Sequence, residues 1–409
     1  MVAVSIGIEQ FQSNDEERKG FELVAEALRS SRRIIVVTGA GTSVSAGIPD
    51  FRSADGLYAR VLASSNEEGS TKQQSIKGRD FFDAGLFLNH ATRPVFNRFV
   101  AELRNMCQQG KPTLTHYFLQ RLHKDGKLLR WYTQNIDGLE DQLGMLTSIE
   151  ADELVPVSPG KLAAPRKAQI VALHGTLQRL ICAACKKTVA FNDAFQESFA
   201  KGCSPECPHC AEFAMNRQLA GRRPVKCGIL RPDIVLYNEP HPQGDQIAEH
   251  VNNDLGRRPT LLLVMGTSLR VVGLKKMVKD LARAVHSQPN GLVVYVNKSE
   301  AAPKSEWRTI FDYELLGECD RWMELIEQQW KSPREKINAP TPKKDGRIDQ
   351  IFKITRSALP RTAKGKTAEK ENENPFEEAP RLDSLKSENS TEGKRLVIRT
   401  RAQQRVAIS

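Results

Sequence analysis

Five short runs of mostly apolar residues divide the chain up to Val296. Runs of this length that do not alternate between apolar and polar residues predict strands buried on both faces, as in a parallel sheet. Between the runs, apolar residues recur at helical spacing, as in Phe21, Val24 and Leu28. This alternation predicts an α/β fold with a Rossmann-like parallel sheet. The five runs are Ile34–Val37, Leu128–Tyr132, Ile170–Leu173, Leu261–Met265 and Leu292–Val296.

Polar or glycine residues follow each of these runs directly. In an open parallel sheet, ligands bind outside the carboxyl ends of the strands, so the five tips are expected at one edge. A single tip can be an ordinary turn, and Thr267-Ser268 alone would make a good helix cap. All five together predict one binding site. The tips are Gly39, then Gln134, Asn135, Ile136 and Asp137, then His174, then Gly266, Thr267 and Ser268, and finally Asn297.

The first tip opens a segment from Thr38 to Ser53 with the text TGAGTSVSAGIPDFRS. Small residues at 39–41 allow backbone N–H groups to approach a pyrophosphate, because a Cβ atom there would hold the ligand away. The spacing differs from G-x-G-x-x-G, and a tight loop is an equal alternative for Gly-Ala-Gly alone. The full segment is far more specific. It resembles the signature of the sirtuins, which are NAD-dependent protein lysine deacylases.

Two Cys-x-x-Cys pairs lie 21 residues apart, Cys182 with Cys185 and Cys207 with Cys210. Four thiolates at this spacing predict a closed tetrahedral zinc site, which is structural because no position stays open for water. Two unrelated redox pairs are the alternative. Cys203 and His209 are expected to be non-ligands. The metal is expected to hold together a smaller, partly helical module of about residues 175–230, so catalysis has to come from other residues.

The resemblance covers about residues 20–330 and implies NAD as a co-substrate. The signature loop would hold the pyrophosphate and shield the reacting carbon, with Phe51 excluding water. Asn135 and Asp137 would order the nicotinamide ribose and the carboxamide, and Gln134 would face the ribose. The cofactor residues implied on this side are Gly39, Ala40, Gly41, Thr42, Ala46, Pro49, Asp50, Phe51, Arg52 and Ile136.

The same resemblance implies the binding of the adenosine half of NAD. Its phosphate and adenosine would lie against Gly266, Thr267, Ser268 and Asn297. Cys319, in the text GECD, matches the position near the adenine. For Cys319 alone, a buried core thiol is an even alternative.

His174 combines a strand end with a side chain that titrates near neutral pH, which suits a general base. A packed or capping histidine is the alternative. By the resemblance, the carbonyl oxygen of acetyl-lysine attacks the ribose carbon that loses nicotinamide, and His174 then removes a proton from a ribose hydroxyl. Asn135 is the second residue implied in catalysis. The products would be free lysine, nicotinamide and O-acetyl-ADP-ribose.

Residues 227–239, with the text CGILRPDIVLYNE, resemble the sirtuin segment that pairs with the substrate backbone. A peptide that adds as a strand needs exposed backbone groups and apolar walls, and Ile234, Val235 and Tyr237 can supply them. An ordinary edge strand is the alternative. The sequence departs from the usual family text at Tyr237-Asn238, where Phe-Gly is usual, and at Thr42, where Ile is usual.

The formal charge of +11 over 409 residues is distributed unevenly. Residues 331–409 hold 19 Lys and Arg against 11 Asp and Glu and few apolar residues, which predicts a disordered basic tail. Such clusters serve nuclear import or contact nucleic acid, and a solvated tail without a partner is an equal alternative. A flexible N-terminus (1–15), a catalytic domain (16–330) and an exposed insertion (about 144–168) complete the predicted organisation.

The chain does not open with a cationic region before an apolar core, and no apolar run approaches about 18 residues. A soluble intracellular protein without membrane contact is therefore expected. Within the sirtuins, residues 46–58 and 78–88 look most like a nuclear branch described from fungi. The resemblance implies a histone deacetylase on chromatin, with roles in silencing and genome maintenance. Mono-ADP-ribosyl transfer, longer-chain deacylation and a non-catalytic chromatin scaffold are the alternatives.

Overall fold

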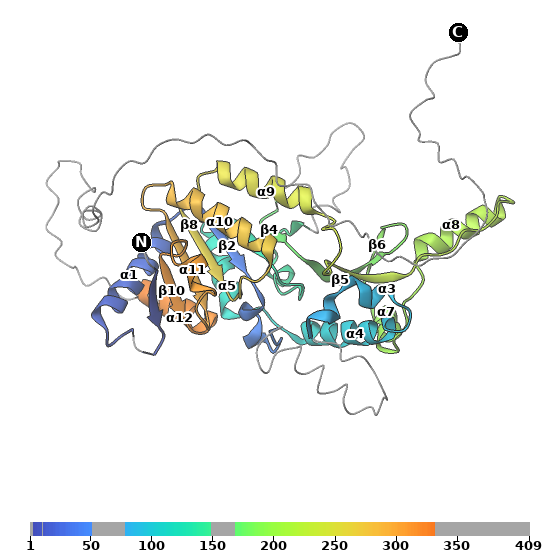
Figure 1. Ribbon diagram of the computed structural model, residues 1–409, viewed down its shortest axis with the longest axis horizontal. Helices are drawn as coiled ribbons and strands as arrows, with labels where there is room; N and C mark the ends of the chain where they lie inside the picture. The colour runs from blue at the N-terminus through green and yellow to red at the C-terminus, as the bar shows by residue number, and fades with distance from the viewer. Residues whose placement is uncertain (1–2, 10, 51–77, 149–167, 332–409) are drawn as a thin grey trace, which may run out of the picture. The chain divides into compact units, whose positions relative to one another are not determined.

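A parallel sheet of seven strands forms the centre of the molecule (Figure 1). The computed structural model describes residues 3–9, 11–50, 78–148 and 168–331, which all belong to one compact unit. The strands are β1 (Val4–Gly7), β2 (Ile34–Thr38), β3 (Leu128–Thr133), β4 (Ile170–Ala172), β8 (Leu261–Met265), β9 (Leu292–Asn297) and β10 (Tyr313–Leu316). Their order in the sheet is β1-β10-β9-β8-β2-β3-β4, and every neighbouring pair is parallel.

The strand order reverses at β2, in the middle of the sheet. From β2 the chain adds β3 and β4 on one side, and it later returns to β8 on the other side. Ile34 of β2 therefore lies opposite both Leu128 and Leu261. A crevice for ligands is expected at the carboxyl ends of strands at such a switch point. The five strands predicted from the apolar runs are confirmed, each to within one residue at its ends.

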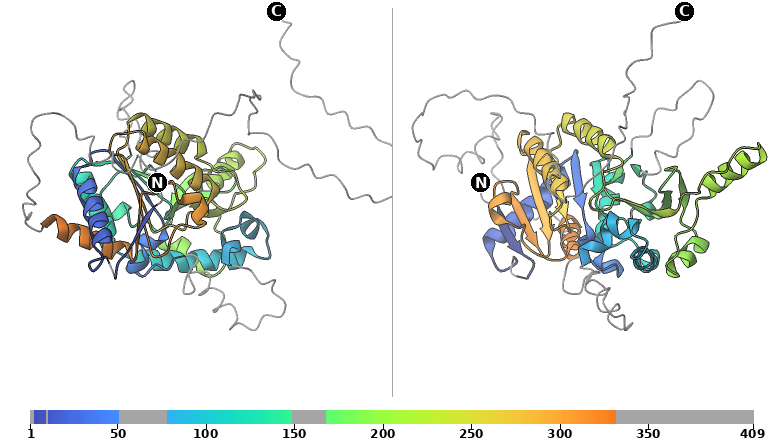
Figure 2. Two further views of the ribbon diagram at one scale, coloured as in Figure 1. Left: turned by 60° about the vertical axis from the view of Figure 1, so that its left-hand side comes forward. Right: turned by 45° about the vertical axis from the view of Figure 1, so that its right-hand side comes forward.

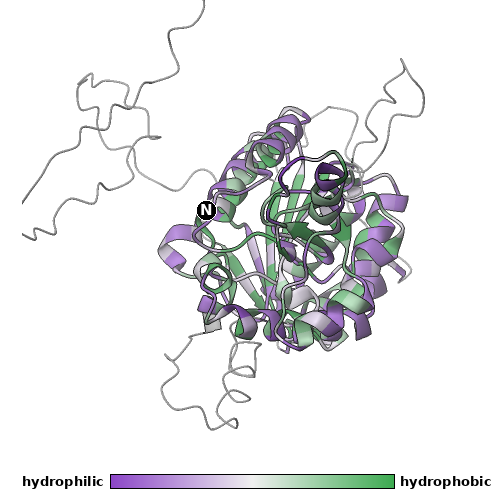
Figure 3. Ribbon diagram, turned by 90° about the vertical axis from the view of Figure 1, so that its right-hand side faces the viewer, coloured by the Kyte–Doolittle hydropathy of each residue, from purple (hydrophilic) through white to green (hydrophobic). Residues whose placement is uncertain are grey.

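Helices cover both faces of this sheet. They are α1 (Asp15–Ser30), α5 (Leu114–Lys124) and α12 (Cys319–Lys331) on one face, and α9 (Gly244–Gly256), α10 (Val272–His286) and α11 (Lys304–Trp307) on the other. In β2, Ile34 and Val36 enter the first cluster, and Ile35 and Val37 enter the second. All four side chains are buried, which explains why the apolar run does not alternate. Figure 3 shows hydrophobic colour along the sheet and hydrophilic colour on the outer helices.

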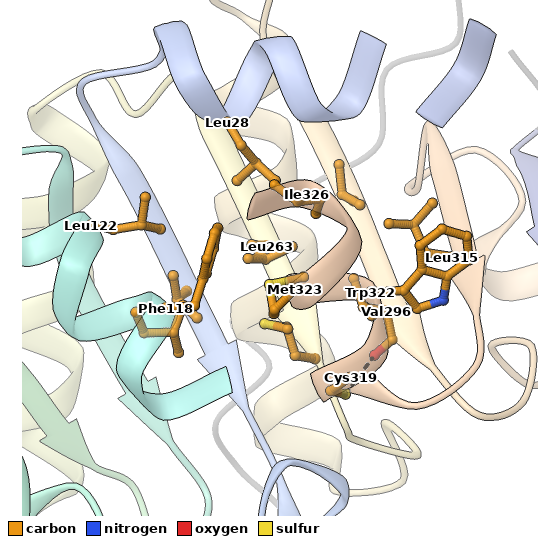
Figure 4. Packing of buried hydrophobic residues seen from close by; sticks show 14 of the residues in the cluster. Leu28, Phe118, Leu122, Leu263, Val296, Leu315, Cys319, Trp322, Met323 and Ile326 are labelled. Carbon is orange, nitrogen blue, oxygen red and sulfur yellow. Dashed lines mark hydrogen bonds between the residues drawn. The ribbon is translucent and has the colours of Figure 1, made fainter. Parts of the chain in front are cut away.

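The cluster under α1, α5 and α12 is shown in Figure 4. Leu28, Phe118 and Trp322 come from three different helices and pack over the sheet near Leu263. Each of these side chains is at most 2% exposed. Burying a side chain of this size contributes roughly 1.5–3 kcal/mol. The sheet lobe is thus held together by apolar packing on both faces.

The N-terminus differs from the flexible segment expected over residues 1–15. Residues Val4–Gly7 form the edge strand β1, which pairs with β10. Only Ile6 of this strand is buried, so the segment gives no apolar run that could reveal it. Backbone hydrogen bonds hold it instead. Helix α1 then begins after Asn14, whose side chain accepts hydrogen bonds from the N–H groups of Glu16 and Glu17.

A smaller lobe is built from segments before β3 and after β4, and it contains an antiparallel sheet of three strands in the order β6-β5-β7. Its elements are β5 (Gly175–Cys182), β6 (Thr188–Ala190), β7 (Leu230–Ile234), α3 (Ala84–Leu88), α4 (Arg93–Gln109), α7 (Asp193–Ala200) and α8 (Pro208–Leu219). A separate hydrophobic cluster joins them. Helix α8 has no buried residue and extends away from the rest of this lobe in Figure 1 and in the right view of Figure 2.

A buried ion pair ties the sheet to α9. Arg130 of β3 donates from Nε to Oδ2 of Asp254 at 2.8 Å and from Nη2 to Oδ1 at 3.1 Å. The Tyr132 hydroxyl also donates to Asp254, at 2.7 Å, and burial followed by this carboxylate raises the pKa of Tyr132. Arg130 donates further to the carbonyl oxygen of Ala168. The network therefore links β3, α9 and the chain that enters β4.

Two predicted segments fall outside the described residues. They are residues 149–167 of the expected insertion and the expected tail from 332 onward. The described flank of the insertion is anchored, since Leu146 N donates to Oε1 of Gln169 at 2.8 Å. Among the described residues, no helix is both long enough and apolar enough to cross a bilayer.

Candidate nucleotide site and metal centre

Three glycines bring the loop after β2 against the loop after β8. Gly39 N donates to the carbonyl oxygen of Met265 at 3.0 Å, and Gly41 N donates to that of Gly266 at 2.8 Å. A Cβ atom on Gly41 would lie 2.7 Å from Cα of Gly266. Gly266 itself has φ +59°, a left-handed conformation that favours glycine. The glycines expected for approach to a pyrophosphate are thus also required by the packing of two loops.

Asn135 joins the loop after β3 to the loop after β2. Its Nδ2 donates to Oγ1 of Thr42 at 3.2 Å and to Oγ of Ser43 at 3.1 Å. The residue is 5% exposed, and its Oδ1 has no hydrogen-bond partner among the described residues. Leaving a buried acceptor unpaired costs about 1–3 kcal/mol. Oδ1 is therefore suited to accept a hydrogen bond from a ligand.

The ring of His174 is held by the loop that carries Asn135. Its Nδ1 lies 2.9 Å from the carbonyl oxygen of Gln134. A carbonyl oxygen can only accept, so Nδ1 carries the hydrogen and the neutral ring has its lone pair at Nε2. Gln134 is fixed in turn, because its backbone N and its Nε2 both donate to the carbonyl oxygen of Thr38 at 3.0 Å. The half-buried imidazole therefore has Nε2 as its basic atom.

A small cavity lies beside Asn135, between the loop after β2 and helix α4. Asp137 is among its lining residues, is 5% exposed, and its Oδ1 accepts a hydrogen bond from Leu139 N at 3.1 Å. Burial, and then the Asp137 carboxylate, raise the pKa of the Cys107 thiol, so this thiol is neutral. The lining residues are Ala40, Ser43, Ile48, Pro49, Leu103, Cys107, Asn135, Ile136 and Asp137.

A second buried carboxyl group, that of Glu140, lies close to this site. It is joined to Oγ1 of Thr133 at 2.5 Å, and both residues line another small cavity together with Asn135. Complete burial, followed by the carboxylate of Asp137, raises the pKa of Glu140 to about 8. Glu140 is therefore mostly protonated at neutral pH. Glu140 was not singled out from the sequence.

Asp320, at the start of α12, forms a hydrogen bond with the loop after β2. It accepts hydrogen bonds from Ser45 Oγ at 2.5 Å and from the N and Oγ1 of Thr115 at 2.8 and 2.5 Å. Burial acts to raise the pKa of Asp320, but these hydrogen bonds outweigh it and the pKa is lowered. No spacing in the sequence predicts a contact between two residues 275 positions apart.

Thr113 makes a second contact behind the same loop. Its Oγ1 donates to the carbonyl oxygen of Thr42 at 3.1 Å, and it forms a capping box with His116 at the start of α5. The only sequence signal for this helix start is the text Pro112-Thr113 with His116, which resembles the start of the helix before the second strand in the sirtuins. Its role in supporting the loop emerges only from the fold.

The residues predicted for the adenosine half gather at the ends of β8 and β9. Thr267 is 6% exposed, and its carbonyl oxygen accepts a hydrogen bond from the Tyr295 hydroxyl at 2.7 Å. Ser268 is exposed, and Asn297 donates to the carbonyl oxygen of Ser299 at 3.0 Å. These side chains lie at the same edge of the sheet as His174.

Cys319 lies next to these residues but faces the core. Its Sγ is 3.7 Å from the carbonyl oxygen of Val296, as the dashed line in Figure 4 shows. Complete burial raises the pKa of Cys319 to about 12. The side chain is thus a buried core thiol, and the predicted position of Cys319 near the adenine stays a prediction.

The segment expected to bind substrate follows β7. Val235 N donates to the carbonyl oxygen of His174 at 3.0 Å, and Tyr237 N donates to that of Phe82 at 2.7 Å. Both side chains are half-buried. Ile234 is 3% exposed and packs in the core of the small lobe, and its contact with the substrate lysine stays a prediction. Asn238 has φ +64°, which explains why this position suits glycine or asparagine.

The remaining loop residues are placed as follows. Ala46 ends a short 3-10 helix (Val44–Ala46), and Gly47 follows it with φ +83°. Pro49 is buried in the cavity lining, and Asp50 is half-buried. Phe51 and Arg52 lie outside the described residues.

The four predicted cysteines converge in the small lobe. All four Sγ atoms lie within 4.8 Å of one another, with 3.8 Å between Cys182 and Cys210 and 3.7 Å between Cys185 and Cys207. Tetrahedral zinc with Zn–S bonds of about 2.3 Å requires sulfur separations of about 3.8 Å, so the cluster fits zinc. A Cβ atom on Gly228 would lie 2.5 Å from Cys182 Sγ, which explains the glycine there.

The fold and this edge together define a class. The molecule is a doubly wound α/β nucleotide-binding protein with a second lobe built on a four-cysteine site that fits structural zinc. The Sir2 family profile matches residues 39–152 and 161–273, more than half of the chain. The chain belongs to the Sir2 family.

Several fungal proteins are similar in sequence. The NAD-dependent histone deacetylase HST3 of Candida albicans is 38% identical over 308 residues, which are 75% of this chain and 61% of that protein. HST3 of Saccharomyces cerevisiae, also an NAD-dependent histone deacetylase, is 38% identical over 77% of this chain and 69% of its own length. The NAD-dependent protein deacetylase hst4 of Schizosaccharomyces pombe is 32% identical over 85% of this chain and 81% of its own.

Solved structures share the fold. One described as "Sir2-p53 peptide-NAD+" aligns with a TM-score of 0.51 at 24% identity, over 75% of this chain and 97% of that chain. Another, described as "Structural Basis for the Mechanism and Regulation of Sir2 Enzymes", aligns with a TM-score of 0.53 at 22% identity, over 76% and 98%. These similarities establish the architecture of a Rossmann-like sheet with a smaller lobe.

Proposed function

We propose that this protein is an NAD-dependent protein lysine deacetylase that acts on histones in the nucleus. Membership of the Sir2 family supports the reaction class, and the histone deacetylase names of the fungal relatives support the substrate. The observation that carries the proposal is the hydrogen bond between His174 Nδ1 and the carbonyl oxygen of Gln134. This hydrogen bond anchors the imidazole of His174, which is the candidate base, to the loop after β3. The same loop presents the unpaired Oδ1 of Asn135.

The residues at the sheet edge fit NAD. The glycine loops have no side chains that would hold a ligand away from the backbone. Asn135 offers an unpaired acceptor in its Oδ1, and Asp137 lines the cavity beside it. When bound, NAD supplies a ribose carbon from which nicotinamide can depart. Asn135 would accept a hydrogen bond on the nicotinamide side, and the ends of β8 and β9 would receive the adenosine half.

His174 would act as the general base. Its Nε2 would accept a proton from a ribose hydroxyl, while Nδ1 keeps its hydrogen bond to Gln134. That bond maintains one tautomer and stabilises the protonated ring. Asn135 is oriented by the two bonds from its Nδ2, so the oxygen and not the amide nitrogen is presented. Ile48 and Leu103 in the cavity lining would exclude water.

The histone segment would bind beside the small lobe. Val235 and Tyr237 lie directly after β7 and are tied to His174 and to Phe82 by backbone hydrogen bonds. An acetyl-lysine peptide that adds as a strand there would place its side chain near the imidazole. Zinc would hold this lobe in shape and take no part in the chemistry. In this scheme the catalytic domain comprises the sheet lobe, which includes β1, and the small lobe, and chromatin is the site of action.

Product analysis tests the proposal. The full-length protein is incubated with NAD and an acetyl-lysine histone peptide, and the products are identified by mass spectrometry. We expect free lysine peptide, nicotinamide and O-acetyl-ADP-ribose. His174→Ala should reduce the rate by about 10²–10⁴-fold, and the exposed control His90→Ala should not. ADP-ribosylated peptide or protein in place of deacetylated peptide would contradict the proposal.

A further inference from the structure

Basic side chains gather where three neighbouring strands begin, at the edge of the sheet opposite the nucleotide site. Strands β8, β2 and β3 are adjacent and parallel, so the segments that enter them lie side by side. Each segment is rich in arginine or lysine. We call this set the amino-edge patch: Arg29, Arg32 and Arg33 before β2, Arg121, Lys124 and Lys127 before β3, and Arg257 and Arg258 before β8.

Contacts between the segments show that the patch is continuous. Lys127 Nζ donates to the carbonyl oxygen of Arg29 at 2.7 Å, and Thr260 N donates to that of Arg33 at 3.0 Å. Seven of the eight basic side chains are exposed, and Lys127 is half-buried. Arg121 is paired with Glu327 at 3.3 Å, and Asp125 lies near Lys127. The patch therefore keeps a large positive excess.

Helix dipoles account for only part of this charge. Basic residues stabilise the last turn of a helix, as Arg29 does in α1 and as Arg121 and Lys124 do in α5. Arg32 and Arg33 lie beyond the end of α1, and Arg258 lies beyond the end of α9. Residues 1–330 hold 41 Lys and Arg against 38 Asp and Glu, so eight cations at one edge are a strong local concentration.

We propose that the amino-edge patch binds the sugar-phosphate backbone of double-stranded DNA. Double-stranded DNA carries one negative charge per about 1.7 Å of its axis, so a dense array of cations gains affinity by releasing counterions. Because neighbouring strands lie about 4.8 Å apart, the patch is about 10 Å wide across the three strands. Long arginine side chains extend this width to that of the major groove of DNA, about 12 Å. The nucleotide edge stays free for a peptide.

DNA suits this surface better than an acidic protein does. Protein interfaces depend on exposed aromatic or aliphatic anchors at their centre. The exposed large apolar residues of the described chain include none within the three segments of the patch, the nearest in sequence being Tyr117 on α5, four residues before Arg121. The Trp330 ring, which Arg121 and Lys127 approach at 5.7 and 5.2 Å, is half-buried, so the three segments themselves present charge, which is typical of contacts to phosphate groups. The inference rests on the proposed action on chromatin, where nucleosomal DNA lies beside the histone substrate.

The experiment compares pairs of arginines in the full chain. Fluorescence anisotropy measures the affinity for a labelled duplex of arbitrary sequence over a range of salt concentrations. Arg32→Ala with Arg33→Ala, and Arg257→Ala with Arg258→Ala, should each weaken binding about tenfold at low salt and reduce the salt slope by about 1–2. Arg222→Ala with Arg223→Ala is the matched control, an exposed arginine pair in the small lobe, and should bind as the unaltered protein does.

Further variants distinguish charge from structure. Arg32→Lys with Arg33→Lys keeps both charges and should restore binding, and unfolding temperatures check that all variants fold. Deacetylation of a short acetyl-lysine peptide should be unchanged in the patch variants. Absence of this activity in the unaltered protein would contradict the proposed function, and it would leave the DNA-binding measurement unaffected. The proposal is overturned if the patch variants keep full affinity, or if the control pair loses as much. Equal binding to a poly-glutamate peptide would assign the patch to acidic proteins instead.

Discussion

The sheet lobe and the small lobe reach a fixed shape by different means. In the sheet lobe every residue of β2 and of β8 is buried, and apolar clusters cover both faces. In the small lobe β6 has no buried residue and neither does α8. The cysteines that would bind zinc lie on β5, on α8 and in the turns beside them. Burial therefore maintains the sheet lobe, while in the small lobe metal ligation would add to a hydrophobic cluster that leaves β6 and α8 without buried residues.

This difference matters for the site, because the site lies where the lobes join. His174 precedes β5 directly, and its carbonyl oxygen accepts the hydrogen bond from Val235 of the small lobe. Its ring is held by Gln134, which follows β3 of the sheet lobe. Damage to either lobe should therefore affect activity, but only one of the two should depend on metal.

The largest effect should follow loss of a zinc ligand. Cys207→Ser removes one of four thiolates, and structural zinc contributes about 10–16 kcal/mol in small metal-dependent domains. We expect loss of bound zinc and of nearly all activity, with the sheet lobe still folded. Elemental analysis, activity and circular dichroism measure this. Cys203→Ser, an exposed cysteine outside the cluster, is the control. A zinc-free variant with full activity would remove the distinction between the lobes.

A smaller effect should follow loss of the buried carboxylate in the sheet lobe. Asp254→Ala leaves the buried guanidinium of Arg130 without a charge partner, which costs about 3–5 kcal/mol. The unfolding temperature should fall by roughly 10 °C while the zinc content stays at one per chain. Asp280→Ala breaks an exposed pair with Arg283 and should change the unfolding temperature by very little. Equal shifts in the two variants would show that Asp254 is not buried as described.

The smallest effect should be a pH dependence at the site. The pKa of Glu140 is raised from 4.5 to about 8 in the folded state, so the folded protein binds this proton more tightly than the unfolded chain does. The resulting stability is fully present below about pH 4.5 and is lost as the pH rises toward 8. Glu140→Gln places a neutral amide there that does not titrate, and it should gain roughly 3 kcal/mol relative to the unaltered protein between pH 5 and pH 8.

Thermal unfolding across this pH range measures the effect of Glu140. Glu212→Gln, at an exposed position on α8, is the control and should follow the unaltered protein at every pH. If Glu140→Gln shows the same pH dependence as the unaltered protein, the buried carboxyl group does not titrate in this range.

The sequence was sufficient for features that leave a local pattern. The five buried strands were predicted because neither face meets water, which gives continuous apolar runs such as Leu261–Met265. The four cysteines were predicted because metal ligation requires a particular residue type at a particular spacing. The gathering of polar tips at one edge followed from the parallel arrangement alone.

Other features depend on contacts that no local pattern encodes. The edge strand β1 buries one side chain and is held by backbone bonds, so its residues carry no signal. The clamp between Ser45 and Asp320 joins residues far apart in the chain. The need for glycine at position 41 arises from Gly266, which approaches it only in the folded state. The burial of Ile234 in the core of the small lobe also could not be predicted, because a short strand does not reveal which face is covered.

The most direct test of the central claim is the stoichiometry of one reaction. Nicotinamide release and lysine deacetylation are measured together on an acetyl-lysine histone peptide, with and without NAD. We predict one nicotinamide for each lysine freed, and no deacetylation in the absence of NAD. Deacetylation that proceeds equally well without NAD would contradict the assignment of the sheet edge as a nucleotide site that drives the reaction.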